Sequence, residues 1–274
     1  MHLETLGASV GQGAAIVRDG RASNRPTGVL LVTAEHATNA LPAGHSFGGQ
    51  TLAHNELLGE SHWAYDPGSL DAAGEFAAAA QGVLVAAAFS RLYIDPNRPL
   101  ASDTLVRRRC GDRTVKLNVN TVPEVVAERV RRAWSPYHLC LGAVKAEVEP
   151  AAVLSVHTFN ATYPGMTTDS RNFEVGVIHT FNSKLAEDIS ASLIAAGISS
   201  RVNEPYSGQE GIMFSAEGAA CAREGSKGSQ TAAGRVPAIM LELRNDLCMQ
   251  LSWRKRVVDA VWPVLKKAMT LPQP

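Results

Sequence analysis

The composition is that of a globular protein and argues against several classes of partner. Of the 274 residues, 45% are apolar and 19% are charged, which are ordinary proportions for a chain that buries a core. The 26 basic and 26 acidic residues give a formal net charge of zero, so no basic surface is expected to bind nucleic acids or anionic membranes. The apolar runs reach only about eight residues, too short to span a bilayer.

The sequence shows no secretory signal and no cysteine framework. The first 20 residues contain no apolar stretch of the signal-peptide type. The four cysteines are widely spaced, without a Cys-x-x-Cys pair, which argues against a thiolate metal site or a set of disulfides. We therefore expect a cytoplasmic protein with a single domain over residues 1–274, in which residues 1–25 form a loosely packed N-terminal arm.

Apolar runs and stretches of helical spacing alternate along the chain, as in proteins with a parallel sheet between two layers of helices. A proline at the start of a helix is favourable, whereas Pro136 is expected to bend or break one. In chain order, the sequence predicts a strand over 28–34, a loop over 40–49, helices over 51–63 and 69–81, a strand over 82–89, a polar and basic excursion over 100–121, a long helix from Pro123, strands over 151–156 and 173–179, a helix over 182–196, strands over 198–202 and 236–243, and a helix over 251–268.

Polar residues stand at the ends of four predicted strands, and this is the most informative pattern in the sequence. They are Glu35 and His36, then Arg91 with Asp95, Asn97 and Arg98, then His157, and finally Glu242 with Arg244. The carboxyl ends of parallel strands meet at one edge of a sheet, where open α/β folds bind their ligands. We therefore expect these side chains to share a site.

The residue types at this edge suit a metal-dependent hydrolase. Two neutral imidazoles and a carboxylate are typical ligands of a catalytic zinc ion, which keeps one position open for water. The ion lowers the pKa of that water and polarises a carbonyl group, while a separate glutamate acts as the general base. Arginines bind a carboxylate through two parallel hydrogen bonds, so Arg91 and Arg98 indicate an acidic small molecule.

Several of these residues have a purely structural alternative. His36 and His157 are each compatible with a hydrogen-bonded histidine at a strand end, and His179 either joins the edge or only caps its strand. Glu242 lies in an apolar run, where a carboxylate is rarely buried without a partner. A salt bridge to Arg244 or to a lysine is its alternative role.

The arginines have alternatives as well. For Arg91 and Arg98 the alternative is an ion pair with Asp95 or Asp103. The basic cluster Arg107–Arg109 suits a solvated face better than a ligand site, although it could approach an anionic substrate. No single residue decides between these roles. The convergence of five of these residues on one edge, two histidines, one acid and two arginines, favours the catalytic interpretation.

A rival motif is the segment Gly44–Gly48, which matches the Gly-x-Ser-x-Gly pattern of serine hydrolases around Ser46. That pattern has meaning only at a sharp turn between a strand and a helix. The preceding residues 39–43 include Pro42 and predict no strand, and no oxyanion segment of the His-Gly-Gly-Gly type occurs. A flexible loop, which could serve as a lid over the site, is the simpler interpretation.

Six segments spread in order over residues 30–247 carry a family resemblance, and Ser90–Arg98 is the most specific of them. They are Glu35–Asn39 with Leu41 and Pro42, His62–Asp66, Ser90–Arg98, Val156–Phe159, Asn203–Tyr206 and Leu241–Leu247. In these segments the chain resembles the N-formylglutamate amidohydrolase family. That family is similar in turn to zinc carboxypeptidases and aspartoacylases, which cut an amide next to a free carboxylate.

The resemblance implies a fold, a cofactor and roles for six residues. The expected fold is a three-layer α/β sandwich with a mostly parallel mixed central sheet, of the phosphorylase/hydrolase-like type. The expected cofactor is one Zn²⁺ per chain, although such ligands discriminate poorly among divalent metals. The implied residues are His36 and His157 as zinc ligands, Glu242 as the general base, and Asn97 and Arg98, assisted by Arg91, as the group that binds the substrate carboxylate.

The third metal ligand departs from the pattern of those relatives. They take a carboxylate three residues after the first histidine, where this sequence has Asn39. Asp66 is the candidate, because it follows a segment that resembles the family and precedes a helix near the same edge. Glu35 is the second choice, although adjacent strand residues point to opposite faces.

We therefore predict a metal-dependent hydrolase that cleaves the amide C–N bond of a small N-acyl amino acid with a free carboxylate. The expected partner is this small substrate, with no nucleic acid and no membrane, and a homo-oligomer is left open. Two alternatives remain, a serine esterase or amidase that uses Ser46, and a non-catalytic protein that binds a small acid.

Overall fold

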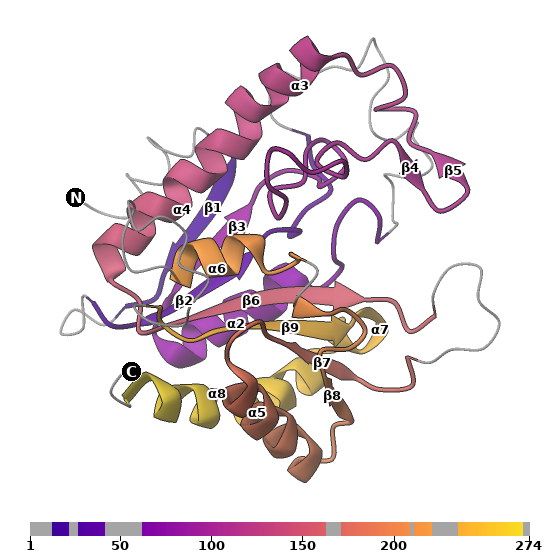
Figure 1. The fold of residues 1–274 in the computed structure, drawn as a ribbon. Helices are drawn as coiled ribbons and strands as arrows, with labels where there is room; N and C mark the ends of the chain where they lie inside the picture. Colours follow the sequence, from indigo (N-terminus) through magenta and orange to yellow (C-terminus); the bar gives the residue numbers. More distant parts are fainter. Residues whose placement is uncertain are drawn as a thin grey trace.

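The computed structural model describes residues 13–21, 27–41, 62–162, 171–208, 211–220 and 235–270. Its centre is a seven-stranded sheet (Figure 1). The strands, in their order across the sheet, are β1 (Ala15–Asp19), β3 (Val83–Ala87), β2 (Leu30–Ala34), β6 (Ala152–Phe159), β9 (Ala238–Arg244), β7 (Val175–Ile178) and β8 (Ser200–Val202).

The sheet is mixed but mostly parallel, as the sequence predicts. The four central strands β3, β2, β6 and β9 run in one direction. At one edge β1 pairs antiparallel with β3, and at the other β7 pairs antiparallel with β9 and parallel with β8. The strands β3, β2 and β6 are buried over their whole length, and β9 is buried at all but its last residue, which explains why each appears in the sequence as a largely apolar run.

Helices cover both faces of the sheet and complete an α/β sandwich of three layers (Figure 1). Alternate residues of β2 point into the two cores, Leu30 and Val32 into one and Leu31 into the other. The first core packs under α2 (Ser69–Ala80), α5 (Ser183–Ala195) and α8 (Leu251–Thr270), and the second packs under α4 (Ser135–Val148) and α6 (Phe214–Ala220).

Several local features differ from the sequence prediction. Within the expected N-terminal arm, the described residues form β1, because pairing with β3 satisfies their backbone. The helix from Pro123 is not broken at Pro136 but passes through a π-helical turn, Val130–Trp134, between α3 (Pro123–Arg129) and α4. Pro136 directly follows this π-helical turn, and the local change in the backbone hydrogen-bond pattern accommodates a residue that has no N–H to donate.

The predicted excursion over 100–121 contains a short hairpin of β4 (Arg109–Cys110) and β5 (Arg113–Thr114). A short helix, α7 (Asn245–Cys248), follows β9 directly. The predicted loop over 40–49 and the helix over 51–63 lie almost entirely outside the described residues. Among the helices that the structure describes, none combines the length and the apolar composition that crossing a membrane requires.

The reversed direction of β7 determines which residues reach the carboxyl edge of the central strands. His179 follows the last residue of β7, which pairs with Met240 near the start of β9. His179 therefore lies toward the amino-terminal ends of the central strands, at the edge of the sheet opposite the site. Gly176, by contrast, is the register partner of Glu242, and a Cβ atom at Gly176 would overlap the backbone carbonyl of Glu204. The absence of a side chain lets the segment after β8 cross the sheet beside Glu242.

Replacement of Gly176 by alanine is expected to destabilise the protein by about 1–3 kcal/mol, because backbone atoms must move to admit the methyl group. The same movement would displace residues 203–206 from the neighbourhood of Glu242. Gly142→Ala is the matched control, since a Cβ there meets no atom within 4 Å and alanine is favoured inside a helix by roughly 0.5–1 kcal/mol. Chemical denaturation of both variants checks the prediction, and equal stabilities would contradict it.

Candidate active site

Three buried residues from separate parts of the chain meet at the carboxyl edge of the central strands. His36 comes just after β2, His157 lies within β6, and Asp66 stands in the turn that precedes α2. Each offers a ligand atom, and these atoms lie within 4.8 Å of one another. The structure thus brings together the three residues predicted as metal ligands.

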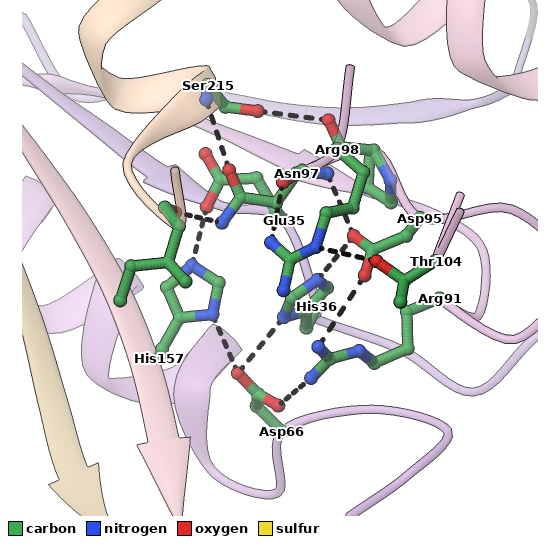
Figure 2. Close-up of polar contacts among 12 residues, drawn as sticks. Glu35, His36, Asp66, Arg91, Asp95, Asn97, Arg98, Thr104, His157 and Ser215 are labelled. Atoms are coloured by element: carbon green, nitrogen blue, oxygen red, sulfur yellow. Dashed lines mark hydrogen bonds and ion pairs between the residues drawn. The ribbon is translucent and has the colours of Figure 1, made fainter. Parts of the chain in front are cut away.

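The carboxylate of Asp66 is the centre of this group (Figure 2). Its Oδ2 atom lies 2.8 Å from Nδ1 of His157 and 3.4 Å from Nδ1 of His36, and its Oδ1 atom lies 3.3 Å from Nη1 of Arg91. The backbone N–H of Asp66 donates to the carbonyl of His36 at 2.8 Å. Burial by itself would raise the pKa of Asp66, but the two imidazoles outweigh it and hold this pKa well below its usual range.

A second carboxylate stands behind each imidazole. Nε2 of His36 lies 2.8 Å from Oδ1 of Asp95, and Nε2 of His157 lies 3.0 Å from Oε2 of Glu35. Ser155 also donates to that Glu35 oxygen at 2.9 Å. In both histidines Nδ1 therefore faces Asp66 while a carboxylate holds Nε2, an arrangement that fixes ring orientation and tautomer in metal sites.

Glu35, the second choice for the third ligand, occupies this supporting position and does not line the cavity. Glu35, Ser155 and His157 lie on the same face of the sheet, as the hydrogen bonds between them require. Asn39, at the position where the family's relatives place a carboxylate, does not line the cavity either. Asp95, which the sequence suggested as an ion-pair partner of the loop arginines, also holds Nε2 of His36.

The same carboxylates determine the charge of His157. Burial would lower the pKa of its imidazole, but Asp66 and Glu35 raise it to about 10. In turn, the hydrogen bond from the His157 ring and its charge hold the pKa of Glu35 below its usual value, although burial alone would raise it. The group is thus a compact set of opposite charges, in which a bound cation could take the place of the imidazolium proton.

Glu242 lies beside this group. It is the register partner of His157 across β6 and β9, its side chain is on the cavity wall, and only 5% of the residue is exposed. Burial raises its pKa to about 7, and the charge of Asp66 adds to this, while His157 opposes it. The proposed salt bridge to Arg244 does not form, because Arg244 pairs with Asp246 at 2.8 Å.

The segment 90–98 is fastened to the same turn that carries Asp66. Ser90 Oγ donates to the carbonyl of Ala64 at 2.8 Å, and the backbone N–H of Arg91 donates to that carbonyl at 3.2 Å. Arg91 makes the ion pair with Asp95 that was its structural alternative, at 3.5 Å, in addition to its contact with Asp66. Arg91 therefore ties the loop to the histidine group.

Asn97 and Arg98 follow in this loop. The Asn97 amide donates to the carbonyl of Ile212 at 2.6 Å and accepts from the backbone N–H of Ser215 at 3.1 Å, so it holds the start of α6. Arg98 donates to the carbonyl of Asn97 at 2.9 Å and to Thr104 Oγ1 at 3.3 Å. Asp103, its alternative partner, forms no ion pair with it among the described residues.

A cavity of about 290 Å³ opens over these side chains. All of the predicted site residues line it: His36, Asp66, Arg91, Asn97, Arg98, His157 and Glu242. The cavity wall also contains five large side chains that were not predicted as site residues, namely Trp63, Arg107, Phe159, Arg171 and Tyr206. Most of them come from loops rather than strand ends, so strand-end position alone would not have revealed them.

Of two further candidates, the structure describes only His179. Ser46 and the rest of the Gly-x-Ser-x-Gly segment lie outside the described residues. His179 lies toward the opposite edge of the sheet, as the direction of β7 requires.

The residues present fit a divalent metal ion. Nδ1 of His36 is buried and has no hydrogen-bond partner in the described residues, which is costly for a polar atom unless a ligand satisfies it. Two imidazole nitrogens and a carboxylate oxygen at this spacing form the donor set of catalytic zinc sites.

Comparisons with known proteins agree on one family and one fold. Residues 28–249 match the family model of N-formylglutamate amidohydrolase. The structure is similar to that of gene product Atu2144 from Agrobacterium tumefaciens, with a TM-score of 0.75 and 23% identity over 96% of each chain. It is also similar to an N-formylglutamate amidohydrolase from Ralstonia eutropha JMP134, with a TM-score of 0.63 and 19% identity over 93% of this chain and 97% of that one. None of the curated proteins searched matches the sequence.

The raised pKa of Glu242 predicts a pH-dependent gain in stability for Glu242→Gln in chelator-treated protein. Because this pKa is above its ordinary value of 4.5, the folded state holds the proton more tightly than the unfolded state. The stability that protonation contributes is complete below pH 4.5 and is lost as the pH rises through 7. The neutral glutamine avoids this loss, so the variant should be more stable than the wild type by about 3 kcal/mol at pH 8.

Denaturant titrations between pH 5 and pH 8 measure this difference, which should shrink toward pH 5. Glu187→Gln, at an exposed position of α5, is the control and should change stability little at any pH. A stability difference for Glu242→Gln that does not vary with pH would contradict the raised pKa of Glu242.

Proposed function

The chain belongs to the N-formylglutamate amidohydrolase family, and on that basis we propose that it hydrolyses the amide C–N bond of a small N-acyl amino acid with a free carboxylate. The observation that carries this proposal is the buried group of His36, Asp66 and His157 at a cavity that Glu242 and arginines also line. The candidate metal ligands, a candidate general base and a candidate carboxylate-binding group then line one cavity, and its volume is about what a small ligand needs.

We propose that His36, Asp66 and His157 hold a divalent cation, with zinc as the expected ion. The two histidines would bind through Nδ1, because Asp95 and Glu35 already hold their Nε2 atoms. Such an ion, when bound, lowers the pKa of water toward neutrality and polarises a carbonyl group. The supporting carboxylates keep the imidazoles in the orientation that ligation needs.

Glu242 is proposed as the group that moves the proton. A carboxylate with a pKa of about 7 is ionised in part of the molecules at neutral pH and can both accept and return a proton. It would accept a proton from the attacking water as the water oxygen bonds to the amide carbon. It would then deliver that proton to the amine nitrogen as the C–N bond breaks.

Arg91 and Arg98 are proposed to bind the free carboxylate of the substrate. Both guanidinium groups line the cavity, and a fixed carboxylate would orient the amide bond toward Glu242. Asn97 is proposed to share this role, since it lines the same cavity. Its amide also bonds to Ile212 and Ser215, which positions the start of α6.

Metal removal tests the core of the proposal. The zinc-loaded protein should hydrolyse N-formyl or N-acetyl amino acids, lose this activity after treatment with a chelator, and regain it when zinc is restored. His157→Ala should fail to retain the stoichiometric zinc that the wild type keeps through gel filtration, as measured by elemental analysis. Asp66→Asn serves as a second ligand variant, in case His157→Ala does not fold.

His179→Ala is the matched control, because this histidine lies toward the opposite edge of the sheet, and it should retain zinc. Full activity in the presence of chelator would refute the metal-dependent mechanism. Inactivation by a serine-directed organophosphonate would instead support Ser46, and tight binding of small acids without turnover would support a binding protein.

Arg98→Ala should mainly impair substrates with a free carboxylate. The loss of a charge-assisted hydrogen bond of this kind costs about 1.5–3 kcal/mol, which corresponds to a roughly 10- to 150-fold decrease in kcat/KM. Steady-state kinetics on an N-acyl amino acid and on its methyl ester measure the effect. An equal decrease on both substrates would count against an anchoring role for Arg98.

A further inference from the structure

His62 is a histidine of the cavity wall to which the proposed function gives no task. It is half-buried, lies four residues before Asp66 and lines the cavity. Its ring packs against that of Trp63, with 4.8 Å between the ring centroids and an angle of 37° between the planes. The packing fixes where the imidazole lies, so its hydrogen bonds determine what it can offer to a molecule in the cavity.

A chain of two side-chain amides holds one ring nitrogen of His62. Asn245, the first residue of α7, donates from Nδ2 to Oδ1 of Asn160 at 2.5 Å. The Asn160 oxygen is thus an acceptor, and the Nδ2 atom of the same amide lies 2.7 Å from Nδ1 of His62. An amide nitrogen only donates, so Nδ1 of His62 is the accepting, unprotonated nitrogen.

The proton of the neutral ring is therefore on Nε2. In the part of the chain that the structure describes, Nε2 makes no hydrogen bond. His62 lines the cavity and Asn160 does not, so the Nε2–H group is left for a molecule that enters the cavity. Burial, and next the charge of Arg91, lower the pKa of His62, which keeps the ring neutral at neutral pH.

The chemistry of the substrate identifies the acceptor for this N–H group. An N-acyl amino acid offers the oxygens of its carboxylate and of its amide carbonyl, and the loop of Arg91 and Arg98 is proposed to bind the carboxylate. The charge of Asp66, a candidate metal ligand, acts on His62, which places His62 near the point where the amide is cut. A neutral imidazole N–H suits a carbonyl oxygen, and its effect grows as negative charge develops on that oxygen.

We propose that His62 is a catalytic residue that donates a hydrogen bond from Nε2 to the carbonyl oxygen of the substrate amide. This rests on the proposed function, in which water attacks the carbon of that carbonyl. His62 keeps its proton throughout, and Glu242 moves the proton of the water. Asn160 and Asn245 are positioning residues, because their hydrogen bonds select the tautomer that has its proton on Nε2.

Nitrogen NMR of the histidine rings tests the tautomer without catalysis. The spectrum is recorded on zinc-loaded protein at about pH 8, above the ordinary pKa of an imidazole, and His62→Phe identifies the signals of His62 by their loss. The wild type should have its proton on Nε2. Asn160→Leu should change the chemical shift of Nδ1, since it removes the group that donates to this nitrogen. A proton on Nδ1 in the wild type, or an unchanged Nδ1 shift in Asn160→Leu, would overturn the inference.

Kinetics test the catalytic role. His62→Phe keeps a planar ring against Trp63 but removes the N–H group, so kcat should fall roughly 100-fold, as for loss of one donor to a developing oxyanion, with a much smaller change in KM. The decrease should be the same for an N-acyl amino acid and for its methyl ester, because both contain the amide carbonyl. His179→Phe is the matched control, since His179 lies toward the opposite edge of the sheet, and should keep kcat.

Zinc content and a thermal melt establish that each variant is loaded and folded. A decrease confined to the free acid would place His62 in carboxylate binding, and a change in KM alone would make it a residue of ground-state binding. Either result would overturn the inference while the proposed function stands.

A wild type that hydrolyses no N-acyl amino acid would refute the proposed function but would still allow a test of His62. The amide would then persist in the sample, and addition of N-acetylglycine should shift the Nε2 signal of His62. An unmoved Nε2 signal at saturating N-acetylglycine would overturn the inference as well.

Discussion

The carboxylate of Asp66 is the interaction on which the rest of the site depends. It contacts both imidazoles and Arg91, and the backbone N–H of Asp66 donates to the carbonyl of His36, just after β2. One side chain therefore joins the carboxyl edges of β2 and β6 to the loop after β3. An isolated carboxylate at 3% exposure would be very unfavourable. The surrounding cations make its burial tolerable, and this requirement holds the segments of the site in a single arrangement.

Around this compensated centre, the cavity wall carries charges that the fold itself does not neutralise. Glu242 is buried with one oxygen that has no partner in the described residues, and the guanidinium of Arg107 lies over the face of Trp63. A buried polar atom without a partner costs stability in a protein without ligand. Enzymes commonly accept such a cost, since groups arranged for a ligand cannot also be satisfied in its absence.

Much of the architecture could be predicted because burial leaves a direct trace in the sequence. The runs that became β2, β3, β6 and β9 are continuously apolar, and the polar residues that end them mark the functional edge. The antiparallel direction of β7 left no such trace, because a buried strand has the same composition in either direction. β1 was missed for a related reason, since an edge strand with one exposed end needs little apolar sequence. The positions of Glu35 behind His157 and of Arg107 over Trp63 were also not predicted, as each depends on contacts with residues far away along the chain.

The sequence by itself determined the fold class, the family, and the set of residue types from which a metal-dependent amide hydrolase is built. These follow from hydrophobic pattern and from motifs, which are local properties of the chain. Only the tertiary structure decided between Asp66 and Glu35, placing the first among the imidazoles and the second behind His157. It also showed that the Asn97 amide bonds to the start of α6 and that Arg107 lines the cavity. The physical reason is that a side chain's role depends on its partners in space, and the pairing of strands and packing of loops that choose those partners are not written in any local stretch of sequence.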